Sequence, residues 1–155
     1  MGQVLRKRLR QSRFENPVQE AFLNVLVASG HLRDRVDRLL ARHRLTSGQF
    51  NVLRILRGAS PAGLPRCEIA ARMLERAPDV TRIVDRLVRS GYVERGKSEE
   101  DRRHSIATIT RRGLTLLERL DPEIRASTDD LAKRITDREA ETLSRLCEKL
   151  YEEEL

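Results

Sequence analysis

The hydrophobic period of the sequence changes at Gly91, and this change limits the folds that the chain can adopt. Before Gly91, apolar residues recur at steps of three and four, which is the spacing of amphipathic helices. After it, two short β-type segments, 92–95 and 105–110, flank the polar and charged stretch 96–104. The pattern predicts a helical chain that carries one β-hairpin with a long charged tip.

Residues 18–42 form the longest amphipathic stretch of the chain. Their apolar positions alternate between steps of four and three, so one side of the predicted helix is an apolar stripe. A helix of this length either packs inside its own domain or projects from it and pairs with another chain. We expect pairing, with Val18, Phe22 and Val25 in the dimer interface.

Three shorter helices follow, separated by turn residues. Thr46 can cap the first of them, because Gln49 three residues later can return a hydrogen bond to the cap. Residues 59–65 contain prolines and a glycine that predict a turn or a very short strand before a helix over 67–74. Pro78 predicts the start of the next helix, because the N–H that proline lacks would have no partner in a first helical turn. We also expect Pro78 among the DNA-contact residues.

The C-terminal part is also predicted to be helical. A helix from about Arg112 is interrupted or kinked at Pro122, and a last helix from Asp137 carries an apolar stripe through Leu143, Leu146, Leu150 and Tyr151. The fold class is therefore mainly α with a small β wing. We expect a basic, poorly ordered arm over 1–15, a helical dimerisation region over 16–44 and 114–155, and a winged helix-turn-helix lobe over 45–113.

The helix after Pro78 has one apolar and one polar face. Its apolar residues follow the i, i+3, i+4, i+7 rule and must face a core, and Gly91 suits the left-handed position past a helix end. Two short helices followed by a hairpin form the arrangement that places the second helix in the DNA major groove. The residues left outward are Asp79, Thr81, Arg82, Asp85, Arg86 and Arg89, which form either an ordinary solvated face or a DNA-reading one.

Side-chain chemistry assigns roles within this face. Arginine can contact guanine O6 and N7 together, and threonine can touch a base edge or a thymine methyl, so Thr81 and Arg82 are the base-reading candidates. Arg86 and Arg89, one or two turns later, are expected to meet phosphate.

The predicted hairpin tip mixes charges of both signs, including Lys97, Asp101, Arg102 and Arg103. Asp101 can hold Arg103 in a charge-assisted pair, and such an oriented arginine suits a narrow minor groove. The alternative is a solvated loop with an incidental ion pair.

The formal net charge of +7 is unevenly placed along the chain. Residues 1–15, 16–65 and 66–113 each carry +4, whereas 114–155 carry −5. A polyanion would be attracted to the first three segments and repelled by the last, and nucleic acid is the leading candidate.

Cys67 and Cys147 give neither a disulfide framework nor a metal-ligand spacing. Cys67 follows Arg66 and could be reactive, but we expect a small residue buried under the DNA-binding lobe.

No apolar run approaches the ~18 residues of a membrane span, so we expect a cytoplasmic protein with no membrane partner, no metal and no cofactor.

Three segments resemble the MarR (multiple antibiotic resistance regulator) family. They are LTSGQFNVLRIL, EIAARMLERAPDVTRIVDRLVRSGYVER and DRRHSIATITRRG. The last is similar to the family's Asp-x-Arg wing signature at Asp101 and Arg103, with Ile109 and Thr110 where the family commonly has Leu-Thr. The chain lacks the early cysteine of the peroxide-sensing branch and the tryptophan of the urate-responsive branch.

The resemblance implies a homodimer whose first and last helices interdigitate and whose winged lobes grip a pseudo-palindromic duplex. It also implies a repressor released by a small molecule or an oxidant. We place a pocket for an aromatic or phenolic effector at His31, Arg35, Phe50 and Leu53. The chain shows no phosphate loop, nucleophile elbow or metal motif of an enzyme, and the alternative function is a dimeric helical adaptor that binds protein.

Overall fold

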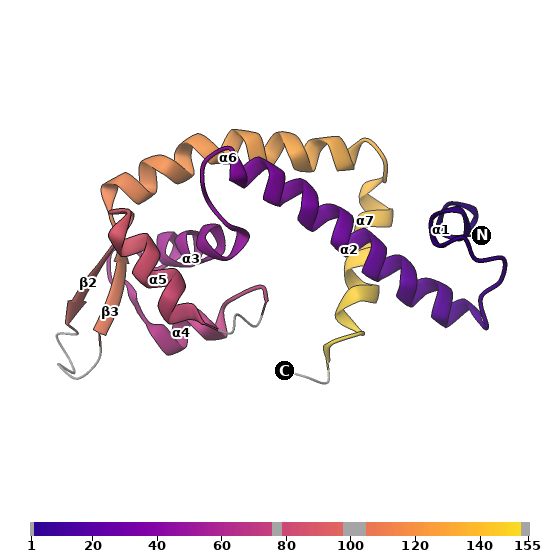
Figure 1. The fold of residues 1–155 in the computed structure, drawn as a ribbon, viewed down its shortest axis with the longest axis horizontal. Coiled ribbons are helices and arrows are strands. Elements are labelled where there is room, and N and C mark those ends of the chain that lie inside the picture. Colours follow the sequence, from indigo (N-terminus) through magenta and orange to yellow (C-terminus); the bar gives the residue numbers. More distant parts are fainter. Residues whose placement is uncertain (1, 76–78, 98–104, 153–155) are drawn as a thin grey trace. The chain divides into compact units, whose positions relative to one another are not determined.

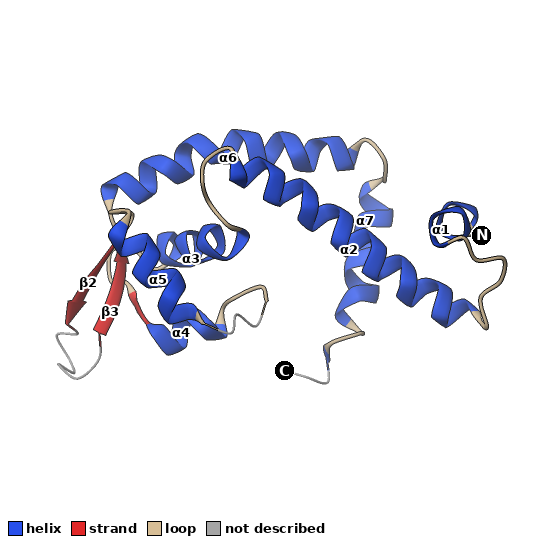
Figure 2. Ribbon diagram, in the orientation of Figure 1, coloured by secondary structure: helices blue, strands red, loops and turns tan. Residues whose placement is uncertain are grey.

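The computed structural model describes residues 2–75, 79–97 and 105–152 of the chain. These residues form mostly helices with one small sheet (Figures 1 and 2). They divide into two compact units, Met1–Phe50 and Asn51–Leu155. The predicted fold class, mainly α with a small β wing, is confirmed.

The first unit contains α1 (Gln3–Leu9), α2 (Pro17–Ala41) and the start of α3 (Ser47–Gly58). The side chain of Asn16 caps α2 by accepting a hydrogen bond from the Gln19 N–H at 2.9 Å, and Pro17 occupies the first turn, where a missing N–H costs nothing. The long helix predicted over 18–42 is therefore present within one residue at each end.

The arm that we expected to be poorly ordered contains α1. Leu5 is 2% exposed, and the guanidinium of Arg6 lies over the Phe14 ring, 5.8 Å from its centroid. A buried leucine and a cation–π contact thus hold part of the segment that we expected to be poorly ordered.

Helix α3 begins where the capping pattern predicts. The Thr46 N–H donates to Gln49 Oε1 at 2.9 Å, and the Gln49 N–H donates to Thr46 Oγ1 at 3.2 Å. These reciprocal bonds satisfy donors that a helix start otherwise leaves unpaired.

The second unit contains the rest of α3, then β1 (Leu64–Pro65), α4 (Arg66–Ala71), α5 (Val80–Arg89), β2 (Val93–Lys97), β3 (Ser105–Ile109), α6 (Arg111–Ala132) and α7 (Asp137–Glu148). The sheet is antiparallel with the order β1-β3-β2, and Ala107 of β3 lies opposite both Leu64 and Arg95. Helix α5 packs on α4 and on β2. The core of the second unit contains fully buried residues from α3, α4, α5 and α6: Val52, Leu53, Leu56, Ile69, Leu87, Leu117 and Leu120.

Helix α4 ends earlier than the predicted Leu74. The Arg72 N–H bonds back to the Ile69 carbonyl at 3.2 Å, and the Leu74 N–H donates to the Asn51 side chain at 2.8 Å. The side chain of Asn51 thus takes a donor that a longer helix would have used internally.

Helix α6 is not interrupted at Pro122, because it runs through that residue to Ala132; of the two predicted outcomes, the interruption is wrong and the kink stays a prediction. Burial of Leu117 and Leu120 just before the proline holds the helix, and Asp121 forms an ion pair with Arg57 of α3 at 2.8 Å. Tertiary contacts therefore outweigh the missing backbone hydrogen bond.

The junction between the sheet and α6 is tightly packed. The Thr110 hydroxyl donates to the Gly91 carbonyl at 2.8 Å and accepts the Gly113 N–H at 3.2 Å. Gly91 has a φ of 72°, as predicted for the residue past a helix end. A Cβ on Gly113 would collide with the Tyr92 carbonyl and the Ile109 side chain, so this position requires glycine.

Candidate nucleic-acid interface

Helix α5 divides into a buried and an exposed side, as its apolar spacing predicts. Val80, Val84 and Leu87 are buried and Ile83 is half-buried. Arg82, Arg86 and Arg89 are exposed, while Thr81 and Asp85 are half-buried. The apolar side thus fixes which residues the helix presents to a partner.

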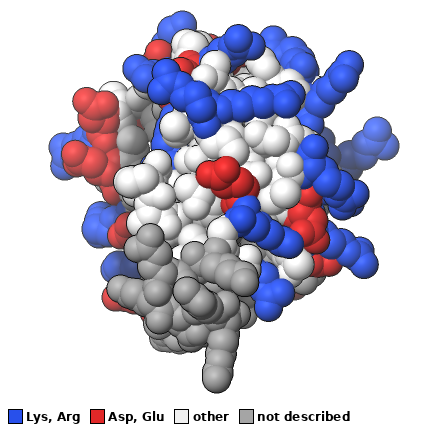
Figure 3. Space-filling model, turned by 90° about the vertical axis from the view of Figure 1, so that its left-hand side faces the viewer, with Lys and Arg blue, Asp and Glu red and all other residues white. Residues whose placement is uncertain are grey.

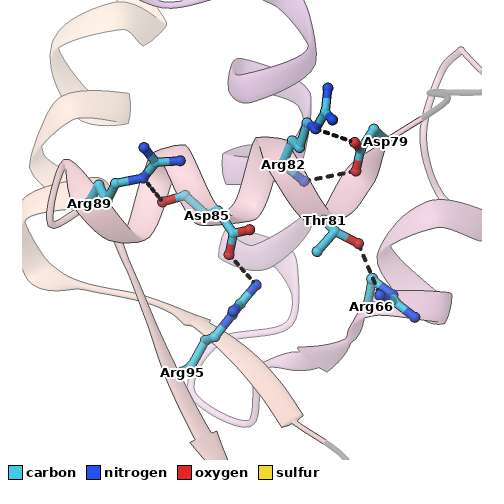
Figure 4. Close-up of polar contacts among 7 residues, drawn as sticks. All are labelled: Arg66, Asp79, Thr81, Arg82, Asp85, Arg89 and Arg95. Atoms are coloured by element: carbon cyan, nitrogen blue, oxygen red, sulfur yellow. Dashed lines mark hydrogen bonds and ion pairs between the residues drawn. The ribbon is translucent and has the colours of Figure 1, made fainter.

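Asp79 caps α5 and also positions an arginine (Figure 4). Its Oδ1 accepts the Arg82 N–H at 3.0 Å, and its Oδ2 pairs with Arg82 Nε at 2.9 Å. The Arg82 side chain stays 80% exposed. Asp79 was expected as an outward contact residue. It accepts a backbone N–H that the start of α5 would otherwise leave unpaired, and it directs the guanidinium of Arg82.

Thr81 lies next to an arginine from the preceding helix. Arg66 of α4 donates from Nη1 to Thr81 Oγ1 at 2.9 Å. The bond joins two helices of the helix-turn-helix at the start of α5. Arg66 was not among the predicted contact residues, although its place at the first position of α4 was a usable signal.

An ion pair connects α5 to the wing. Arg95 Nη2 of β2 lies 2.6 Å from Asp85 Oδ1, and Arg89 Nε donates to the Asp85 backbone carbonyl at 3.4 Å. The side chains of the pair are 43% and 37% exposed, so water screens it and its contribution to stability is small. The pair joins Asp85 of α5 to Arg95 of β2 and so connects the two elements through side chains.

A cavity of about 480 Å³ lies among α4, α5 and the sheet. Two guanidinium groups, Arg66 and Arg95, and the Thr81 hydroxyl supply polar lining atoms. The full lining is Pro65, Arg66, Cys67, Ile69, Thr81, Val84, Arg95, Ser105 and Ala107. Cys67 is exposed, which corrects the expectation of a small residue buried under the DNA-binding lobe.

Basic side chains gather on the face of the molecule that carries the hairpin. Figure 3 shows Lys and Arg mainly along the upper and right-hand edges of this face, with Asp and Glu at its left edge and near its mostly uncharged centre. Such a distribution attracts a polyanion over a distance set by the salt concentration.

Several predicted DNA-contact residues lie outside the described residues. These are Pro78, Asp101, Arg102 and Arg103. Lys97 is the last residue of β2. The predicted Asp101–Arg103 pair therefore stays a prediction.

The predicted effector pocket also stays a prediction. Its members His31, Arg35 and Phe50 belong to the first unit and Leu53 to the second. Phe50 and Leu53 are buried, His31 is exposed and Arg35 is half-buried.

The predicted dimer residues are largely exposed. Val18, Phe22, Leu143 and Leu146 are each at least half exposed, as are Leu150 and Tyr151, and Val25 is half-buried. Leu150 and Tyr151 lie beyond Glu148, where α7 ends, so the predicted stripe is longer than its helix.

The described residues contain neither a cluster of metal-ligand side chains nor a helix that could span a membrane. Among residues 2–75, 79–97 and 105–152, no three His, Cys, Asp or Glu side chains are grouped as a metal site would need. No helix in the described part of the chain has the length and apolarity needed to cross a membrane.

Comparison with known proteins gives one consistent result. The model of the MarR family matches residues 45–105. The HTH-type transcriptional regulator PrsX of Escherichia coli is 31% identical over 106 residues, which cover 67% of this chain and 64% of PrsX. The aligned part thus spans less than two thirds of that relative.

Two solved structures cover more of the chain. A MarR transcription factor from Planctomyces limnophilus is 32% identical, with a TM-score of 0.67, over 88% of this chain and 98% of that one. The MarR family regulator Sco3205 of Streptomyces coelicolor, solved in complex with DNA, is 23% identical, with a TM-score of 0.79, over 92% of this chain and 91% of that one.

Proposed function

Because the chain belongs to the MarR family, we propose that it is a transcriptional regulator that binds a specific double-stranded DNA sequence as a homodimer. The observation that carries this proposal is the face of α5, where a buried apolar side holds three arginines outward and Asp79 directs one of them. The solved DNA complex of Sco3205 supports the same partner. A regulator of this kind works where the chromosome lies, which in bacteria is the cytoplasm.

We assign the DNA contacts as follows. Arg82 and Thr81, at the start of α5, read base edges in the major groove. Arg86 and Arg89 contact phosphates on the exposed side of the same helix. Lys97, Asp101, Arg102 and Arg103 contribute the wing, with Arg103 in the minor groove.

The homodimer is proposed from apolar surface that the described part of the chain leaves exposed. Phe22 and Leu26 on α2 and Leu143 and Leu146 on α7 are each at least half exposed. Exposed apolar patches of this kind mark protein interfaces. Two-fold symmetry then sets the half-sites about one helical turn, or ~10 base pairs, apart.

We also propose that a small anionic effector binds the cavity among α4, α5 and the sheet. Its volume is within the range of small-molecule sites, and Arg66 and Arg95 supply cationic donors suited to a carboxylate. An anion there competes with Asp85 for Arg95 and disturbs the connection between α5 and the wing. The test adds aromatic acids to the protein–DNA complex. They should release the DNA from the wild-type protein but not from an Arg95→Met variant.

The main experiment selects bound sequences from a random duplex pool and measures affinity by fluorescence anisotropy. Arg82→Ala is expected to lose about 1–3 kcal/mol at one base position, whereas Arg86→Ala weakens all sequences and lowers the salt slope by about one. Arg125→Ala, an exposed arginine of α6, is the matched control.

The competing function is a helical adaptor that binds protein. Neutralisation of phosphates makes DNA affinity fall steeply with salt, whereas an adaptor has no such dependence on a duplex. The proposed function would be refuted if the duplex pool yielded no preferred sequence and if the protein showed no salt-dependent binding to any duplex.

A further inference from the structure

The turn between α2 and α3 holds an arginine in a backbone conformation that favours glycine. Arg44 has a φ of 57°. The Leu45 N–H donates to the Leu40 carbonyl at 3.1 Å, and the Arg44 N–H donates to the Ala41 carbonyl at 3.0 Å. These two bonds form the Schellman arrangement at the end of a helix, in which the left-handed position is usually glycine because a Cβ there is strained. Arg44 therefore makes this turn less stable than glycine would.

Packing explains the conformation of the turn but not the presence of an arginine in it. Leu40 and Leu45 are 0% and 6% exposed, so their burial and the two backbone bonds fix the left-handed residue. The side chain of Arg44 is exposed, and no hydrogen bond or ion pair joins its guanidinium to any other residue that the structure describes. A strained residue whose side chain does nothing for its own fold points to a role outside the chain.

The residues before Arg44 indicate an anionic partner. Residues 38–44, which we call the basic segment, contain three arginines and one histidine and no acidic residue. Arg38, Arg42 and Arg44 are all exposed. Guanidinium groups bind phosphates through paired, charge-assisted hydrogen bonds, so the composition of the basic segment suits a phosphate backbone.

The basic segment leads directly into the proposed DNA-binding lobe. Helix α3 begins at Ser47, three residues after Arg44, and runs without a break to Gly58. The side chain of Asn51 on this helix accepts the Leu74 N–H, from the segment between α4 and α5, at 2.8 Å. The basic segment thus precedes the helix that holds the turn of the helix-turn-helix.

We propose that Arg44 contacts a phosphate of the DNA backbone beside the half-site that α5 reads. The contact explains why an arginine stands where glycine would relieve strain. A phosphate contact carries no sequence information, but it fixes the register and orientation of a protein on the duplex. The inference rests on the proposed function and adds a contact outside α5 and the wing.

Substitution by glycine tests the proposal, because it should change stability and affinity in opposite directions. Arg44→Gly removes the strain, so urea unfolding should show a folding equilibrium about twofold to fivefold more favourable. It also removes one phosphate contact from each protomer. Fluorescence anisotropy at about 0.1 M salt should then show about eightfold weaker binding for each lost contact, on the selected and the scrambled duplex alike. The salt slope should fall by about one for each protomer.

A second left-handed arginine supplies the matched control. Arg10 ends α1 with a φ of 53° and is also exposed, so Arg10→Gly makes the same change in charge and in backbone strain. This variant should gain stability but keep the wild-type affinity and salt slope. Arg44→Lys retains the cation and should keep the salt slope of the wild type.

Four results would overturn the inference. Arg44→Gly could keep the wild-type affinity and salt slope, or Arg10→Gly could lose as much affinity as Arg44→Gly. Arg44→Gly could be less stable than the wild type, which would mean that the arginine supports its own turn. Sedimentation could show that Arg44→Gly dissociates into monomers and binds DNA normally once dimeric, which would place Arg44 against a second copy of the chain. A wild-type chain that binds no duplex refutes the proposed function instead.

Discussion

Asp79 uses its two carboxylate oxygens for two different purposes, and a pair of substitutions separates them. Oδ1 accepts the Arg82 N–H and Oδ2 pairs with Arg82 Nε. Asn at this position still caps a helix, but its amide nitrogen cannot accept a bond from a guanidinium. Asp79→Asn therefore removes only the direction given to Arg82, whereas Asp79→Ala removes the cap as well.

The two functions differ in their effect on stability. Loss of the cap costs about 1 kcal/mol, which corresponds to roughly a fivefold change in the unfolding equilibrium. The Arg82 side chain is 80% exposed, so solvent screens its ion pair and the pair contributes less than about 0.5 kcal/mol. Urea unfolding should place Asp79→Asn close to the wild type and Asp79→Ala about 1 kcal/mol below it.

Binding to the selected duplex should rank the variants differently. In both variants the guanidinium of Arg82 is no longer held by Asp79 and must be ordered when DNA binds. This ordering costs about 0.5–1.5 kcal/mol of binding free energy for a long side chain. We therefore expect both variants to bind the selected duplex several-fold more weakly. A scrambled duplex, bound through phosphates alone, should bind equally well or better because one negative charge is gone.

Two results would refute this reasoning. Tighter binding of Asp79→Asn to the selected duplex would mean that Asp79 only repels DNA and does not orient Arg82. Equal loss of stability in the Asn and Ala variants would mean that capping is unimportant. Glu118→Gln, an exposed charge removal on α6, controls for the change in net charge.

Three further predictions concern stability. Double substitution of Arg57 and Asp121 to Met and Asn should show a coupling of about 0.5–1 kcal/mol in urea unfolding, since both side chains are about one third exposed. Bonds from the Thr136 N–H and hydroxyl hold the pKa of Glu139 below its usual 4.5, so its contribution is complete above that value and is lost as pH falls through the lowered pKa. Glu139→Gln should remove that acid dependence from the helical circular dichroism signal. Gly113→Ala should lower the free energy of unfolding by about 1–3 kcal/mol, because a Cβ has no room there; an unchanged urea midpoint would contradict that packing.

Features that depend on nearby residues were predictable from the sequence. Thr46 and Gln49 cap α3 as their spacing indicates, and Gly91 takes the left-handed conformation after α5. The core-facing side of α5 follows from its period. Each of these depends on residues within one or two helical turns, which the sequence displays directly.

Features that depend on tertiary contacts were not predictable. Arg95 meets Asp85 only because the chain reverses between α5 and β2. Helix α6 continues through Pro122, where Leu117 and Leu120 just before the proline are buried and Asp121 pairs with Arg57 of α3. Propensity and spacing carry no information on such contacts, since their partners are set by the fold.

The bond between Arg66 and Thr81 changes how Thr81 can read DNA. A threonine hydroxyl has one donor and two acceptor sites, and the bond from Arg66 occupies an acceptor site. The hydroxyl proton of Thr81 therefore remains available, which favours an acceptor such as N7 of a purine over the amino group of cytosine or adenine. Thr81→Val should weaken binding most at a base position that presents such an acceptor, whereas Thr81→Ser should keep the preference. Equal preferences in the Val and wild-type proteins after duplex selection would exclude a hydrogen bond from Thr81 to a base.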